Sequence, residues 1–206
     1  MSIVDVREKI PNDVFTALEL NACLAGYRHK GAKISSMTRK GEIIPVRRGL
    51  YVFPEQLRRE TLSRGALANR IYGPSYVSED FALGGYGLIP ETVQMVTSIA
   101  RGRTREFTTP FGVFRYRYCR SRAYSLGVTL AGEGQNRFLI ATPEKALFDK
   151  ALFDQRFDGS DVEQYLFEDL RIDEEALRRF RRTRIAELAP FMCGRLKNLG
   201  EFLKHL

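Results

Sequence analysis

Residues 40–51 constrain the fold of this chain more than any other segment. They read KGEIIPVRRGLY, so a glycine follows a basic stretch and two short apolar runs flank a pair of arginines. Gly41 is a natural helix stop, because glycine readily takes up the left-handed backbone conformation that ends many helices. The pattern predicts a helix over residues 28–40. Two strands are expected to follow at residues 43–46 and 50–53, joined by a turn at residues 47–49.

A helix, a glycine turn and a two-stranded wing tipped with arginines outline a winged helix-turn-helix, a module that binds duplex DNA. A preceding helix is expected to start at the cap Asn12 and to bury one face. The residues on that face are Val14, Phe15, Leu18, Ala22 and Cys23. Residues 1–54 are therefore expected to form a DNA-binding domain, which Pro54 closes.

Beyond Pro54 the chain alternates between helical and extended patterns and then becomes wholly helical. Helices are expected over residues 54–72, where the first half resembles a solvated linker, and over 81–86. Another helix is expected to start at Thr142, and the chain is expected to be wholly helical from Asp173 onward. Strands are expected at 76–77, 93–99, 105–108, 113–119, 126–130 and 137–141. The predicted fold is α+β: the winged helix-turn-helix, then a mixed α/β domain over residues 55–206 that ends in a helical tail at about 151–206.

The charge balance favours an acidic partner. Lys and Arg number 33 against 25 Asp and Glu, which gives a formal net charge of +8. The surplus lies in the first 150 residues, and such an excess suits a polyanion such as nucleic acid, although simple solubility would also explain it.

Cysteine and histidine usage excludes several other classes. The three cysteines lie far apart, and there are only two histidines. We therefore expect no metal site, and an odd cysteine count without a recognisable signal peptide indicates the cytoplasm. No apolar run approaches the roughly 20 residues of a membrane span, so no membrane partner is expected.

Candidate DNA contacts follow from the roles of the two predicted elements. Side chains near the start of a recognition helix read base edges, while other cations and hydroxyls bind phosphates. The predicted base readers are Arg28, His29, Lys30 and Lys33, and the predicted phosphate or minor-groove contacts are Ser35, Ser36, Arg39, Lys40, Arg47 and Arg48. The alternative is a solvated basic face on a small structural domain.

A second basic cluster lies on the hairpin predicted at residues 105–119. It comprises Arg101, Arg103, Arg105, Arg115 and Arg117, with Arg120 and Arg122 following. Arginine beside Tyr116 and Tyr118 could extend a nucleic-acid footprint by stacking on bases, or could bind a protein partner. Alternatively, the charges keep an exposed strand from aggregating.

The acids near the two later helix starts raise the question of a metal-dependent nuclease. Glu79, Asp80, Glu144 and Lys145 are the candidates. Helix capping and favourable interaction with the helix dipole explain them better. None of the common nucleotide-binding or hydrolase motifs occurs in the chain. We therefore expect no enzyme activity, no catalytic residue and no cofactor.

Several segments together resemble the AbiEi-type antitoxins of type IV toxin–antitoxin (abortive infection) systems. The residues that carry this resemblance are KGEIIPVRRGLY at 40–51, Leu67 and Ala68, YVSEDFALGGYGLIPE at 76–91, TTPFGVFRY at 108–116, and IATPEKALFD at 140–149. They occur in the expected order and cover most of residues 28–150.

The resemblance implies a DNA-binding antitoxin that takes part in phage defence. In such proteins a winged helix binds inverted repeats in the operon's own promoter and represses transcription. The C-terminal domain supports antitoxicity against a nucleotidyltransferase-like toxin, which need not form a stable complex with the antitoxin. Two alternatives remain open: a freestanding winged-helix transcriptional regulator without a toxin, and a module that neutralises a toxin by direct protein binding.

Overall fold

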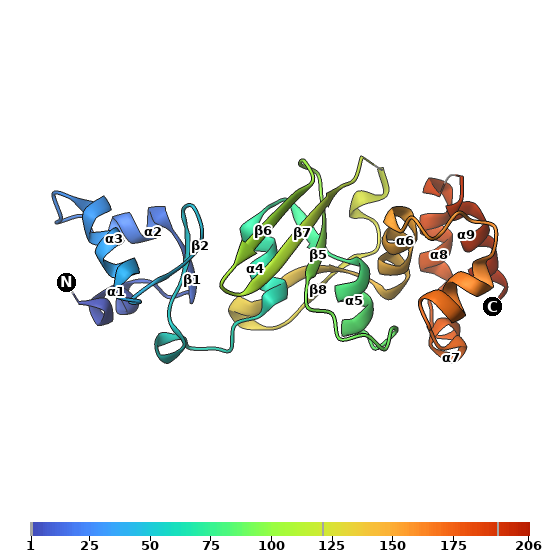
Figure 1. Ribbon diagram of the computed structural model, residues 1–206, viewed down its shortest axis with the longest axis horizontal. Coiled ribbons are helices and arrows are strands. Elements are labelled where there is room, and N and C mark those ends of the chain that lie inside the picture. The colour runs from blue at the N-terminus through green and yellow to red at the C-terminus, as the bar shows by residue number, and fades with distance from the viewer. Residues whose placement is uncertain (1, 121, 193) are drawn as a thin grey trace.

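The computed structural model describes residues 2–120, 122–192 and 194–206, and it is a mixed α+β structure (Figure 1). The molecule is elongated, and the chain runs from one end to the other. We call residues 2–53 the head, residues 64–153 the central part and residues 154–206 the tail. In the described part of the chain, no helix is both long and apolar enough to cross a membrane.

The head combines three helices with a small antiparallel sheet. Its elements in chain order are α1 (Ile3–Lys9), β1 (Val14–Thr16), α2 (Ala17–Cys23), α3 (Lys30–Arg39), β2 (Ile44–Arg47) and β3 (Leu50–Val52). The strand order is β1-β3-β2, so β3 lies in the middle. Helices α1 and α2 both start with a capping box, in which a hydroxyl and an acid satisfy orphan backbone N–H groups in both directions.

The helix predicted from the cap Asn12 is wrong in its first turn. Val14 pairs with Val52 of β3, so the chain is extended there, and α2 begins only after Thr16. Thr16 caps it through Glu19. Leu18, predicted to face the core, is 80% exposed. The residues share no helical face because the first two belong to a strand whose side chains alternate between two sides.

The predicted helix and hairpin at residues 28–53 are confirmed, with small shifts at their ends. Helix α3 starts at Lys30, so Arg28 and His29 precede it. Gly41 follows the helix with a φ of +70°, and Gly49 in the hairpin turn has a φ of +81°. Both angles lie in the left-handed region that favours glycine. For this reason the sequence predicted the end of the helix at Gly41 and the hairpin turn at Gly49.

The two faces of the head sheet lead to different cores. Phe15 and Phe53 face the helices of the head and join a compact cluster with Leu20, Leu24, Met37 and Ile43. Val14, Val46, Leu50 and Val52 point the other way and belong to the large cluster of the central part. The head therefore has its own core and is also attached to the rest of the molecule through apolar contacts.

The central part is a six-stranded mixed sheet with helices on both faces. After a short 3-10 turn (Glu55–Leu57) the elements are α4 (Arg64–Ile71), β4 (Ser75–Val77), α5 (Glu79–Gly85), β5 (Val96–Ala100), β6 (Arg105–Thr109), β7 (Gly112–Tyr118), β8 (Val128–Ala131), β9 (Phe138–Ala141) and α6 (Pro143–Phe153). The strand order is β6-β7-β5-β4-β9-β8, with β4–β9 and β5–β7 parallel.

Two buried tyrosines bind helices that lie over opposite faces of this sheet. The Tyr116 hydroxyl donates to the carbonyl of Ala68 on α4 at 2.7 Å. The Tyr76 hydroxyl donates to Asp149 on α6 at 2.9 Å. Each bond ties a strand to the helix above it, so the sheet is fastened on both sides.

Most predicted elements of the central part are confirmed, and one helix is not. The strands shift by up to three residues at their ends, and Thr142 and Pro143 start α6 as expected. Only residues 64–71 of the helix predicted over 54–72 are α-helical. Tyr118, at the end of β7, is 46% exposed, whereas Tyr116 is fully buried.

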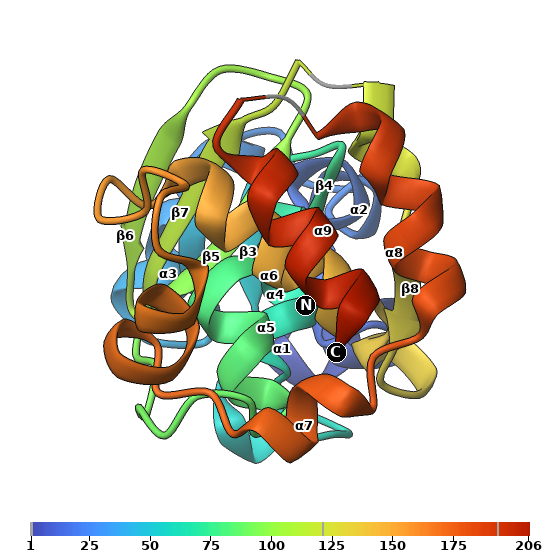
Figure 2. The ribbon, with the colours of Figure 1, turned by 90° about the vertical axis from the view of Figure 1, so that its right-hand side faces the viewer.

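The tail is helical, as predicted. It contains a π-helical turn (Gln164–Asp169), α7 (Glu174–Arg178), α8 (Arg182–Leu188), a 3-10 turn (Ala189–Phe191) that includes Pro190, and α9 (Leu196–His205). Helices α8 and α9 pack against α6 and cover that end of the molecule (Figure 2). Leu188, Leu196, Leu199 and Leu203 of the tail are buried.

Candidate nucleic-acid interface

Helix α3 buries one side in the head and leaves the opposite side open. Met37 is buried and Ile34 is half-buried against the head core. The open side carries small residues, Gly31, Ala32 and Ser35, which are all exposed. A Cβ atom added at Gly31 would meet nothing within 4 Å. The middle of this face therefore carries only short side chains, and it is open to solvent.

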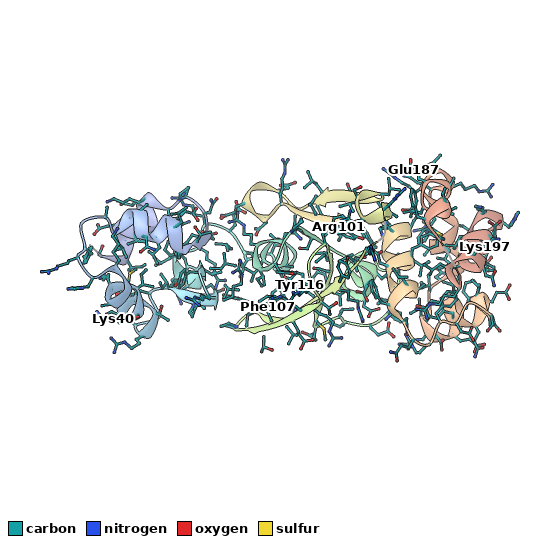
Figure 3. All side chains as sticks on the ribbon, turned by 90° about the horizontal axis from the view of Figure 1, so that it is seen from above. Lys40, Arg101, Phe107, Tyr116, Glu187 and Lys197 are labelled. Atoms are coloured by element: carbon teal, nitrogen blue, oxygen red, sulfur yellow. The ribbon has the colours of Figure 1, made fainter. Side chains whose placement is uncertain are left out.

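Basic side chains lie at both ends of this face. Arg28 and His29 lie before the first turn of α3, and Arg39 and Lys40 lie at its end; all four are exposed. Lys40 projects from the head at the end of the molecule opposite Glu187 and Lys197 of the tail (Figure 3). A helix with small side chains in its centre and cations at both ends can approach a polyanion closely.

The predicted contact residues differ in how freely they reach solvent. Lys30, Lys33 and Ser36 are half-buried, and the Lys33 ammonium lies 5.7 Å from the centre of the Tyr27 ring. The other seven predicted contacts are exposed. Sequence reasoning missed Gly31 and Ala32 as part of the face, because it considered only charged and hydroxyl side chains.

The wing hairpin lies beside the central sheet. Arg47 and Arg48 are exposed at its turn, and the Arg47 guanidinium donates to the Arg48 carbonyl at 3.1 Å. Strand β2 contacts edge strand β6. Burial raises the pKa of Tyr116, and the positive charge of Arg47 opposes that rise. The wing charge is thus close to Tyr116, whose partner across the β6–β7 hairpin is Arg105.

The five arginines predicted as a second surface separate into two groups. Arg115 pairs with Glu106 at 2.8 Å, and Arg117 is half-buried, with its guanidinium 2.9 Å from Glu79. Arg101, Arg103 and Arg105 are exposed at the far end of the hairpin. In this second group, Arg105 has Tyr116, the residue near the wing charge, as its cross-strand partner.

The exposed group combines arginines with aromatic rings. The Arg105 guanidinium lies 5.7 Å from the centre of the Tyr72 ring, and that of Arg101 lies 5.1 Å from the Tyr124 ring. Arg101 also donates to the carbonyl of Arg120 at 3.4 Å. These cation–π contacts hold the planar guanidinium groups near the surface.

Glu79 lies in the first turn of α5, as predicted, but its side chain is buried. Its exposed fraction is 1% and its φ is +52°. Burial raises the pKa of Glu79 to about 8, although Arg117 acts in the opposite direction. Ser78 makes no capping bond; its hydroxyl donates to Asp149 at 2.8 Å.

The four residues considered for a nuclease have separate partners. Asp80 accepts from Lys150 at 2.9 Å, and Glu144 accepts from the backbone N–H of Arg181 at 2.8 Å. Lys145 pairs with Asp149 at 2.6 Å, deep in the interior. Over residues 2–120, 122–192 and 194–206, no group of three or more His, Cys, Asp or Glu side chains is placed to hold a metal ion. Two of these contacts join α6 to its neighbours, α5 and the tail.

A buried carboxylate joins the head to the rest of the molecule, and the sequence provided no signal for it. Asp13 is 3% exposed and pairs with Arg7 at 2.6 Å. It accepts from the backbone N–H groups of Arg59 and Glu60 at 3.1 Å. Gln135, between β8 and β9, accepts from the Asp13 N–H at 2.6 Å and donates to its carboxylate at 2.9 Å.

Neighbouring contacts strengthen this junction. The Asn136 amide donates to the Thr61 carbonyl at 2.8 Å and to Glu60 at 3.0 Å, and its oxygen accepts from Ser63 N–H at 3.1 Å. Arg70 of α4 donates to the Val14 carbonyl at 2.8 Å. The head and the connection at residues 54–63 are thus both held by the loop at residues 134–136.

Comparison with known proteins adds no identification. Neither a protein-family model nor a curated protein matches the chain.

Proposed function

We propose that this protein is a DNA-binding antitoxin that represses its own operon, and that its head is a winged helix-turn-helix. The order of helices and strands in the head supports this assignment, because β1 completes a three-stranded sheet behind α3 and the β2–β3 hairpin supplies a wing. The single observation that carries the proposal is the open face of α3, with small residues in its centre and cations around them.

In the proposed complex α3 enters the major groove of duplex DNA. Gly31, Ala32 and Ser35 let the helix come close to the base edges, where a hydroxyl or a methyl group can be read against bases. Arg39 and Lys40 at the end of the helix bind phosphates. Arg47 and Arg48 on the wing bind phosphate or the adjacent minor groove.

Repression follows from occupancy of the promoter, since a protein bound there excludes polymerase. We propose a cytoplasmic protein that needs no cofactor. The antitoxin assignment and the nucleotidyltransferase-like toxin follow from the resemblance of the ordered motifs, and the neighbouring gene tests them. A downstream reading frame of that class supports an antitoxin, and its absence favours a freestanding regulator.

Added bulk on the open face of α3 tests the DNA-binding proposal. Gly31→Gln places a side chain where the helix would meet the groove, and the fold tolerates it because nothing lies within 4 Å of the new Cβ. Gly85→Gln at the end of α5 is the matched control, since its Cβ also meets nothing. The measurement is fluorescence anisotropy with the protein's own upstream region.

We expect Gly31→Gln to weaken binding by tenfold or more, roughly the effect of one poorly fitting base contact. Gly85→Gln should bind like the wild type. Equal affinities for all three proteins would remove α3 from the interface.

A further inference from the structure

Two basic groups from different parts of the chain meet along one side of the molecule. The wing carries Arg47 and Arg48, and the start of β6 with its preceding loop carries Arg103 and Arg105. Strand β2 contacts β6, and Arg47 lies near Tyr116, the cross-strand partner of Arg105. Whether these groups act on one duplex depends on how firmly the head is held.

Besides the apolar contacts of its sheet, the head is held by a polar junction in which one side chain of the central part binds Asp13 twice. Gln135 is the residue of the central part that binds both the backbone and the carboxylate of Asp13. Asp13 directly precedes β1, so its position sets the start of the head sheet. The sheet in turn carries the wing, which joins β2 to β3.

We propose that Gln135 is a positioning residue for DNA binding. Through Asp13 it fixes the head so that the wing and the group formed by Arg103 and Arg105 present one continuous contact surface to a single duplex. This inference rests on the proposed function and deepens it, because it adds a second contact region and the residue that aligns it with the first.

The main effect of the Gln135–Asp13 contact is to align the head with the central part. The head has its own core of eight buried residues, so it does not need Gln135 to stay folded. Without the amide, the head remains attached by the connection at residues 54–63, by the Arg70–Val14 hydrogen bond and by its apolar contacts, but Asp13 loses its bond to the central part and the range of head orientations becomes broader. Arg103 and Arg105 then meet the bound duplex at a lower effective concentration. Affinity therefore falls only for DNA that is long enough to reach these two arginines.

Duplex length separates alignment from general damage. A mixed-sequence duplex of about 12 base pairs covers little more than one helical turn and reaches the head alone, whereas one of about 30 base pairs can also reach the arginines of the central part. The proteins are the full chain, Gln135→Ala, and Gln164→Ala as the control. Gln164 is an exposed glutamine of the tail, and its backbone N–H donates to Asp161. Binding is measured by anisotropy at low salt, and thermal unfolding checks the fold.

We expect Gln135→Ala to bind the short duplex within twofold of the wild type and the long duplex about tenfold more weakly. Gln164→Ala should match the wild type on both. The double variant Arg103→Ala/Arg105→Ala should lose affinity for the long duplex alone. Combining it with Gln135→Ala should cause little further loss of affinity, because the effects of substitutions at coupled residues do not add. If Gln135→Ala lowers the unfolding temperature markedly, Gln135→Met, which fills similar space without the hydrogen bonds, replaces it.

Other outcomes overturn the inference. Equal weakening on both duplexes, or no weakening on either, means that Gln135 does not align a second contact. Fully additive losses mean that the glutamine and the arginines act separately. If the wild type binds neither duplex, the proposed function itself fails and the inference falls with it, whereas good binding of the short duplex with no length dependence contradicts the inference alone.

Discussion

Gln135 binds Asp13 at two points, although 121 residues separate them in the chain. Its amide oxygen accepts from the Asp13 backbone N–H at 2.6 Å, and its amide nitrogen donates to the carboxylate at 2.9 Å. A single side chain thereby sets both the position of the backbone before β1 and the direction of a buried charge. The same carboxylate holds Arg7 and the connection at residues 59–60.

Removing the Asp13 carboxylate should destabilise the protein strongly. Asp13→Ala leaves the buried Arg7 guanidinium without its counter-ion, and breaking a buried pair in this way costs about 3–5 kcal/mol. Urea unfolding of Asp13→Ala and of Asp158→Ala, an exposed acid of the tail, measures the difference. A loss below about 1 kcal/mol would mean that the pair contributes no more than a surface ion pair.

The wing arginines should contribute affinity without sequence preference. Phosphate contacts release counterions, so log affinity falls against log salt by about 0.9 per neutralised phosphate. If about five phosphates are neutralised, the wild-type slope is about −4.5, and Arg47→Ala/Arg48→Ala should reduce it to about −2.7 while weakening all duplexes alike.

The tail provides a control with the same loss of charge. Arg179 and Arg182 are exposed far from the head, so Arg179→Ala/Arg182→Ala also removes two positive charges. Its salt slope should stay within about 0.5 of the wild-type value. If this tail variant changes the slope as much as the wing variant does, net charge explains the binding and the wing does not.

Side chains on α3 should instead change sequence preference. Ser35 lies on the open face, where its hydroxyl can reach a base edge. Ser35→Ala should lower affinity for the upstream region several-fold while leaving affinity for mixed-sequence DNA unchanged. The same comparison for Lys33→Ala tests the earlier base-reading prediction for that half-buried side chain. An equal loss on both DNAs would assign either residue to phosphate contact.

Glu79 should make stability fall as pH rises from about 4.5 to about 8. Burial raises its folded pKa to about 8 from an ordinary value of 4.5, while Arg117 and Lys150 oppose the rise and Asp149 and Asp80 add to it. Between these values the folded protein keeps a proton that the unfolded chain releases. The associated stability is therefore complete below pH 4.5 and is lost as pH rises through 8.

The Glu79→Gln variant isolates this contribution, since an amide mimics the protonated acid. Its free energy of unfolding should lose the extra pH dependence between pH 5 and 8, which is at most about 1.4 kcal/mol per pH unit. Exposed Glu175→Gln is the control and should follow the wild-type profile. Parallel profiles for the wild type and Glu79→Gln would show that Glu79 stays ionised in the folded protein.

Local signals explain which elements were predictable. Gly41 and Gly49 have positive φ angles in positions where glycine is strongly favoured, so the end of α3 and the wing turn could be read from short segments. Thr142 and Pro143 likewise define the start of α6 within a few residues. The predicted cations of α3 and the wing could be named because both elements were placed correctly.

Distant contacts explain what was missed. The β1 strand depends on pairing with β3, more than 30 residues later, and in isolation Val14 and Phe15 suit a helix equally well. The burial of Glu79 depends on Arg117 and on the cover from α6, and the Asp13–Gln135 contact joins opposite parts of the chain. No local pattern encodes such pairs, so only the folded structure reveals them.

The central claim is that the head binds the duplex upstream of its own gene, and a titration of the full chain against that region at low salt tests it most directly. Specific DNA binders exceed their own non-specific affinity by about a thousandfold or more. We expect at least that preference for the upstream region over a mixed-sequence duplex of the same length. Failure to bind the upstream region even at low ionic strength, or equal affinity for both duplexes, would contradict the account.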